Sequence, residues 1–157
     1  MQHPPSLLRR LARVLVGVAA VALVAGCSFL GPVASGPLVS IDAHGGHCIE
    51  GECRTVTTID RSGKVTVEGG AGEPLTRAVD PGLASALAGA VDAADYARIT
   101  AVPFAGDCPT AYDGQELTYT FPPAGRAPVT FSSCEVAIDP ADPLFRALDA
   151  LLLAASS

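Results

Sequence analysis

A short apolar run near the N-terminus sets how much of this chain is available to fold. The twelve residues from Val14 to Ala25 are apolar apart from Gly17, and the segment before them holds three arginines and no acidic residue. Such a run is shorter than the roughly 20 residues of a membrane-spanning helix, and a basic start before a short apolar stretch is typical of a secretory signal peptide. We therefore expect the domain to be built from the residues that follow, in an oxidising compartment outside the cytoplasm.

The apolar run ends in Leu23-Val24-Ala25-Gly26-Cys27, which resembles a bacterial lipobox. In proteins with a lipobox, the cysteine thiol receives diacylglycerol and the peptide is cut in front of that cysteine. The resemblance implies that residues 1–26 are a cleaved signal peptide and that Cys27 is the lipid-attachment residue, with acyl chains such as palmitate. It also implies a location on the extracytoplasmic face of the cell membrane, since two acyl chains are enough for stable anchoring. The pair Arg9-Arg10 leaves the twin-arginine route open, although the residues after it favour general secretion.

The charge of the remaining chain limits its partners. Residues 27–157 hold all 16 acidic residues and seven of the 10 basic ones, so their formal charge is −9. Nucleic acid requires a basic face, so we expect no nucleic-acid partner. The expected partners are the membrane, through the lipid on Cys27, and a protein or small molecule that the sequence does not identify.

Four further cysteines predict disulfides. An even number of cysteines in an exported chain is the pattern of a disulfide framework, and these are Cys48, Cys53, Cys108 and Cys134. Of the three pairings that four cysteines allow, the order along the chain favours Cys48–Cys53 and Cys108–Cys134, because each pair flanks or joins neighbouring segments. A small domain without tryptophan depends strongly on such cross-links.

Residue patterns predict one α+β domain over residues 38–157, after a lipidated tether over residues 27–37. Strand patterns occur at 38–42, 54–60, 64–68, 116–121 and 129–131. Helices are expected after Asp80-Pro81 and Asp142-Pro143, because aspartate caps a helix and proline suits its first turn. The predicted fold is a small antiparallel sheet of about four to five strands, with one main helix and a C-terminal helix packed on one face and two disulfides.

The loop predicted after the first strand gathers potential metal ligands. His44, His47, Cys48 and Cys53 lie among three carboxylates between positions 42 and 53, and these side chains can bind zinc or copper. Their spacing is not a standard metal spacing, and a Cys48–Cys53 disulfide would remove both thiolates. We therefore expect a disulfide-closed turn and no cofactor, with metal binding by His44 and His47 as the alternative.

The segment Cys108-Pro109-Thr110-Ala111-Tyr112-Asp113-Gly114 resembles the reactive loop of the subtilisin-inhibitor family. There a Cys-Pro pair precedes the scissile bond, Tyr-Asp follows it, and the cysteine pairs with a later one. The resemblance implies a reactive bond between Thr110 and Ala111, flanked by Pro109 and Tyr112, with Cys108 bonded to Cys134. The chain departs from the family in its much shorter first disulfide loop and in a hairpin before the helix. The alternative is a structural loop in which Asp113-Gly114 turns the chain.

The motifs of common enzyme classes do not occur in the sequence. It holds no nucleophile elbow, phosphate loop, metalloprotease helix or dinucleotide fingerprint, and nothing marks a serine to partner His44 or His47 in a triad. We therefore predict a non-catalytic, membrane-anchored extracytoplasmic lipoprotein that serves as a binding or envelope-associated module. Its plan resembles that of small lipoproteins of GC-rich bacteria. The alternatives are a protease inhibitor acting through Thr110–Ala111 and a metal-binding lipoprotein acting through His44 and His47.

Overall fold

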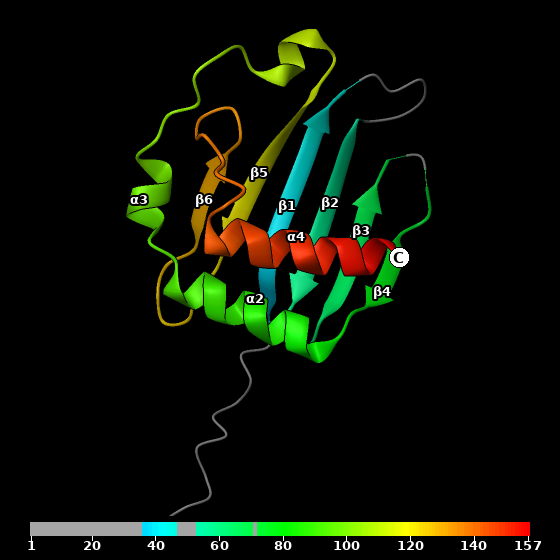
Figure 1. Ribbon diagram of the computed structural model, residues 1–157. Helices are drawn as coiled ribbons and strands as arrows, with labels where there is room; N and C mark the ends of the chain where they lie inside the picture. The colour runs from blue at the N-terminus through cyan, green and yellow to red at the C-terminus, as the bar shows by residue number, and fades with distance from the viewer. Residues whose placement is uncertain (1–35, 47–52, 71) are drawn as a thin grey trace, which may run out of the picture. The chain divides into compact units, whose positions relative to one another are not determined.

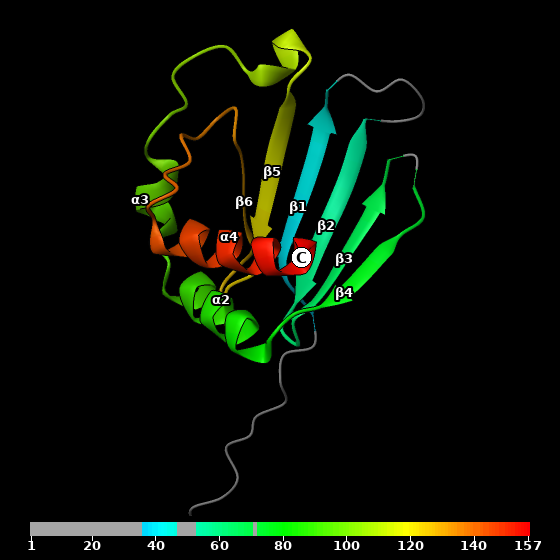
Figure 2. The same cartoon turned by 45° about the vertical axis from the view of Figure 1, so that its right-hand side comes forward.

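The computed structural model describes residues 36–46, 53–70 and 72–157. In these ranges the chain forms one six-stranded sheet in the order β4-β3-β2-β1-β5-β6, with every pairing antiparallel. The strands are β1 (Pro37–Gly45), β2 (Arg54–Asp60), β3 (Lys64–Gly69), β4 (Leu75–Ala78), β5 (Gln115–Phe121) and β6 (Val129–Ser132). Figures 1 and 2 show helices α2 (Pro81–Ala93) and α4 (Pro143–Ser156) lying together across one face of the sheet. This confirms the predicted mixed fold with helices on one side.

The core lies between the sheet and these two helices. Alternate side chains of the central strands, such as Val39 and Ile41 of β1 and Tyr119 and Phe121 of β5, are buried in this core. An aromatic cluster from β5, β6 and α4 fills one part of the layer, with ring centroids 5.5 to 6.4 Å apart. Its members are Tyr119, Phe121, Phe131 and Phe145. Aliphatic side chains such as Leu87, Val91, Leu148 and Leu151 complete the core.

Local signals place both long helices where the sequence predicts them. The Asp80 carboxylate accepts a hydrogen bond from the Gly82 amide at 2.7 Å, and Asp142 caps α4 in the same way through the Leu144 amide at 2.9 Å. In both helices a proline follows the cap, where its missing N–H costs nothing. Asp95 caps the short helix α3 (Tyr96–Thr100).

The predicted count of about four to five strands is wrong, because the described residues form six. Strand β4 was missed since its four side chains are all exposed and give no apolar alternation. Strand β1 also begins at Pro37, inside the predicted tether, and runs on through His44 and Gly45, which were predicted to lie in a loop. A 3-10 helix, η1 (Pro109–Tyr112), occupies the segment after Cys108.

One of the two predicted disulfides lies within the described part of the chain. Cys108 and Cys134 are bonded, with their Cα atoms 5.1 Å apart, inside the usual range for a disulfide. Cys48 lies outside the described residues, so the Cys48–Cys53 pairing stays a prediction. Cys27, His47 and the proposed signal peptide lie outside them as well.

Candidate functional site

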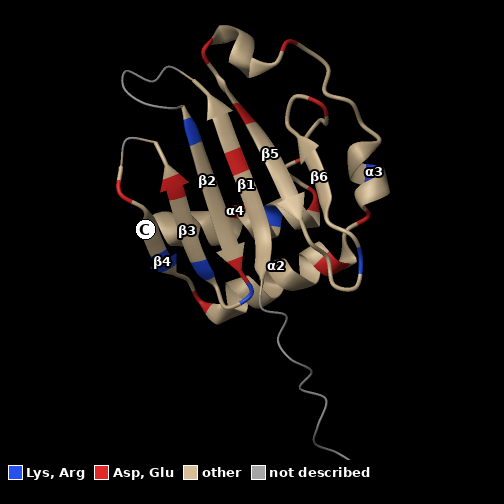
Figure 3. Ribbon diagram, turned by 180° about the vertical axis from the view of Figure 1, so that it is seen from behind, with Lys and Arg blue, Asp and Glu red and all other residues tan. Residues whose placement is uncertain are grey.

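The face of the sheet opposite the helices carries polar side chains. Figure 3 views the molecule from this side, and no helix lies in front of the strands. Directly paired residues of neighbouring strands share a face, so the register defines a row that crosses all six strands and in which every residue bears a hydroxyl group. In sheet order this hydroxyl row consists of Thr76, Thr66, Thr58, Ser40, Thr120 and Thr130.

A neighbouring part of the same face carries an ion pair. Arg54 of β2 donates two hydrogen bonds to the Asp42 carboxylate of β1, at 2.6 Å from Nη2 and 3.0 Å from Nε. The hydrogen bond from Arg54 lowers the pKa of Asp42 below its ordinary value, together with the nearby positive charge. Both side chains reach solvent, so we expect the ion pair to add little to the stability of the fold. It places two opposite charges on this face of the sheet.

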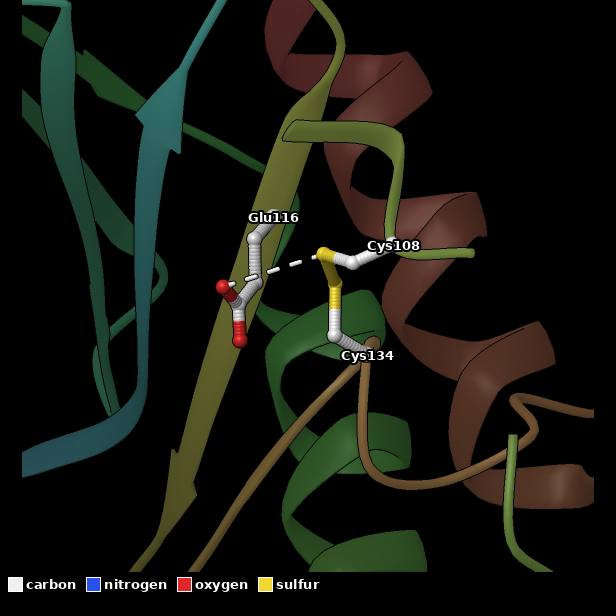
Figure 4. A group of neighbouring side chains, drawn as sticks. All are labelled: Cys108, Glu116 and Cys134. Atoms are coloured by element: carbon white, nitrogen blue, oxygen red, sulfur yellow. Dashed lines mark hydrogen bonds between the residues drawn. A yellow bond between two sulfur atoms is a disulfide. The ribbon is translucent and has the colours of Figure 1, made fainter. Parts of the chain in front are cut away.

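Glu116 stands at the centre of a polar cluster at the end of this face. It pairs with His44 in the β1–β5 register, and the His44 Nε2 atom lies 3.1 Å from Glu116 Oε2. The hydroxyl of Ser132, a buried residue of β6, donates to Glu116 Oε1. Figure 4 shows the Glu116 side chain beside the Cys108–Cys134 disulfide, and its Oε2 atom lies 4.0 Å from Cys108 Sγ. Residues of β1 and β6 and the Cys108–Cys134 disulfide therefore lie around the Glu116 carboxylate of β5.

Close backbone packing holds the disulfide loop against the end of β1. A Cβ atom at Gly45 would lie 2.8 Å from the Thr110 methyl carbon and 2.9 Å from the Gly114 carbonyl oxygen, and the φ of Gly45 is +88°. Only glycine suits both the positive φ and the close approach. Gly45 therefore lets the Cys108–Gly114 loop sit against the end of β1, next to His44.

The predicted inhibitor segment is exposed, but its backbone forms a 3-10 turn and is not extended. Ala111 N–H donates to the Cys108 carbonyl at 2.9 Å and Gly114 N–H to the Pro109 carbonyl at 2.8 Å, so the Thr110–Ala111 bond lies inside a 3-10 turn. Tyr112 is 72% exposed. A scissile segment offered to a protease is normally extended, like other peptides bound in strand form. This geometry gives the inhibitor hypothesis no support, and inhibition stays a prediction.

The predicted metal ligands are placed differently from what the sequence suggested. His44 contacts Glu116, while His47 and Cys48 lie outside the described residues. Among the described residues, one set of three potential ligands has its donor atoms within 4.8 Å of one another, namely Cys108, Glu116 and Cys134. Glu116 was not singled out in the sequence, because its role depends on the β1–β5 pairing between segments some 70 residues apart, which periodicity does not reveal.

Hollows of the described domain include two on its helix side. One, of about 260 Å³, is bordered by Arg98 and Asp142, but Asp142 already caps α4 and accepts a hydrogen bond from Arg98. The other, of about 450 Å³, lies between β3, β4 and the end of α4 and is mainly aliphatic. Neither brings together a nucleophile and a base, so the Glu116 cluster is the better candidate site.

Comparison of the chain with protein-family models, with curated proteins and with solved structures found no match. Among the described residues, no helix has the combination of length and hydropathy needed to span a membrane. The functional proposal therefore rests on two features of the structure: the polar sheet face, and the Glu116 cluster formed by Glu116, His44, Ser132, Cys108 and Cys134.

Proposed function

We propose that this chain is a non-catalytic lipoprotein, anchored through Cys27 on the extracytoplasmic face of the cell membrane, which binds a protein of the cell envelope. The observation that supports binding is the uncovered sheet face with its continuous hydroxyl row. Each hydroxyl both donates and accepts hydrogen bonds, and the row crosses six strands at the usual spacing of about 4.8 Å. Such a surface matches the polar groups and bridging waters of a protein partner.

The position of β1 in the chain is compatible with a lipid anchor on Cys27 and a binding surface on the sheet. Nine residues separate Cys27 from Pro37, where β1 begins. The strand then carries the chain over about 23 Å, at roughly 3.3 Å per residue, before it reaches His44 and the Glu116 cluster. An anchor on Cys27 would therefore hold the domain by the Pro37 end of β1 and leave the cluster at the opposite end of the strand.

The contacts of Glu116 also support a non-catalytic role. A serine triad needs histidine between the acid and the serine, whereas here the carboxylate lies between Ser132 and His44. Ser132 is buried, and its hydroxyl oxygen also accepts a hydrogen bond from the Cys134 amide at 2.9 Å. The hydroxyl is therefore held by structural contacts and is not available to attack a substrate.

Anchoring is tested by fractionation and labelling. The wild-type chain should take up labelled palmitate and sediment with membranes, and Cys27→Ser should lose the label. Uptake of the label by Cys27→Ser would contradict the proposed attachment residue.

Binding is tested by photo-crosslinking from two positions. A photoreactive residue at Thr58, in the middle of the hydroxyl row, should give one dominant adduct with an envelope protein in intact cells. The same residue at Asp149, exposed on α4, is the matched control and should not give that adduct. An equal yield from both positions, or no adduct from Thr58, would remove the support for this face as the binding surface.

A further inference from the structure

We propose that reduction of the Cys108–Cys134 disulfide creates a zinc site whose ligands are Cys108, Cys134, Glu116 and His44. This goes beyond binding of an envelope protein, and it differs from the metal site predicted from His44 and His47. The inference rests on three donor groups whose atoms lie within 4.8 Å of one another, those of Cys108, Glu116 and Cys134, and on His44, whose Nε2 atom lies 3.1 Å from Glu116 Oε2.

The two contacts of Glu116 Oε2 suit ligands of one tetrahedral ion, and the imidazole of His44 has to move closer to the sulfur atoms when the ion binds. With zinc–sulfur distances of about 2.3 Å and zinc–nitrogen or zinc–oxygen distances near 2.1 Å, neighbouring ligand atoms lie roughly 3.3 to 3.8 Å apart. The His44 Nε2–Glu116 Oε2 distance is 3.1 Å, and Glu116 Oε2 lies 4.0 Å from Cys108 Sγ. Both distances are within a few tenths of an ångström of the required values. The sulfur atoms have to separate after reduction, and the Cα–Cα distance of 5.1 Å leaves room for this by side-chain rotation.

The surroundings hold the carboxylate in a suitable orientation. Ser132 donates to Glu116 Oε1, while Oε2 lies 3.1 Å from His44 Nε2 and 4.0 Å from Cys108 Sγ. A hydrogen bond that fixes a ligand in this way is the usual outer shell of a zinc site. The Glu116 side chain is 20% exposed and that of His44 is 48% exposed, so the ion has a path from solvent. Two thiolates and one imidazole favour zinc over magnesium or calcium.

The chemistry balances in two steps. A dithiol reductant transfers two electrons and two protons to the Cys108–Cys134 bond, which becomes two thiols while the reductant becomes a disulfide. Zinc then displaces one proton from each thiol and binds the thiolates with Glu116 and His44. In the oxidised chain both sulfur atoms are tied up in the disulfide, so only the reduced chain should bind zinc tightly.

The test uses the full chain in detergent, with Cys27, Cys48 and Cys53 changed to serine so that Cys108 and Cys134 are the only thiols. Zinc affinity is measured by competition with a chromophoric chelator, before and after reduction by a phosphine. We expect one zinc ion per reduced chain and at least about hundredfold weaker binding to the oxidised chain. Cobalt in place of zinc should give the thiolate charge-transfer absorption and the visible bands of a tetrahedral site.

Glu116→Gln is the decisive variant, and Glu135→Gln is its matched control. Glu135 follows Cys134 directly but is not among the clustered donors. Glu116→Gln should weaken zinc binding to the reduced chain at least about tenfold, as should His44→Ala, whereas Glu135→Gln should leave it unchanged. Equal affinity of the oxidised and reduced chains, or no effect of Glu116→Gln, would overturn the proposal.

Loss of the disulfide could unfold the reduced chain, so its thermal unfolding is measured with and without zinc. Zinc should raise the Tm of the reduced chain, or refold it if it is unfolded, and should leave the Tm of the oxidised chain unchanged. A reduced chain that zinc neither stabilises nor refolds would also overturn the proposal.

Discussion

Removing the Cys108–Cys134 disulfide should cost this domain a large part of its stability. The bond joins residues 26 positions apart. In the chain-entropy model, a closed loop of that length removes about 11.8 cal/mol/K from the unfolded ensemble, which is about 3.5 kcal/mol at 25 °C. The cysteines are only partly buried, so replacing both with alanine leaves little cavity cost to add. A loss of about 3.5 kcal/mol is large against the roughly 5–15 kcal/mol of a typical domain.

The assay is urea unfolding of the full chain, followed by circular dichroism, with Cys108→Ala/Cys134→Ala compared with wild type. The slope of the unfolding free energy against urea should rise slightly, because the unfolded chain becomes more expanded without the cross-link. Tyr112→Ala is the control, since it alters an exposed residue inside the same loop and should change the unfolding free energy by no more than about 0.5 kcal/mol. A loss below about 1 kcal/mol in the double variant, or an equal loss in Tyr112→Ala, would refute the reasoning.

Three further predictions concern the core, the pH dependence and the helix cap. Phe121 is fully buried among aromatic rings, so Phe121→Ala should lower the free energy of unfolding by about 4 kcal/mol in denaturant titrations; a loss under about 1.5 kcal/mol would contradict this packing. Burial raises the pKa of Tyr96 from 10.0 to about 12, so the stability from its neutral phenol is complete below pH 10 and is lost as the pH rises through 12. Thermal unfolding across that range should show a smaller alkaline loss for Tyr96→Phe, and an unchanged loss would count against the shift. Asp142→Ala removes the cap of α4 and should cost about 1–2 kcal/mol, whereas Asp142→Asn, which keeps a capping oxygen, should cost clearly less by the same measurement.

The parts of the fold that depend on neighbouring residues could be predicted from the sequence. The Asp-Pro pairs mark the starts of α2 and α4, because a cap involves only residues within one helical turn. The hairpin of β2 and β3 is likewise local: Asp60 accepts hydrogen bonds from the Ser62 and Lys64 amides across the turn. The Cys108–Cys134 pairing was favoured because four cysteines allow only three pairings and these two flank neighbouring segments.

The parts that depend on distant residues could not be predicted. The pairing of β1 with β5 joins segments separated by three strands, two α-helices and a 3-10 helix, and its register depends on which faces are buried in the finished sheet. Without that register, nothing in the sequence connects His44 with Glu116. Strand β4 was hidden for a different reason, since an exposed edge strand needs no apolar alternation.

The most direct test of the account is the intact mass of the protein purified from membranes, before and after reduction. The account predicts a chain that begins at Cys27 and carries diacylglycerol, with a mass that rises by two hydrogens for each disulfide reduced, at Cys108–Cys134 and at Cys48–Cys53. A chain without lipid, or one whose mass does not change on reduction, would contradict export to an oxidising compartment as a lipoprotein.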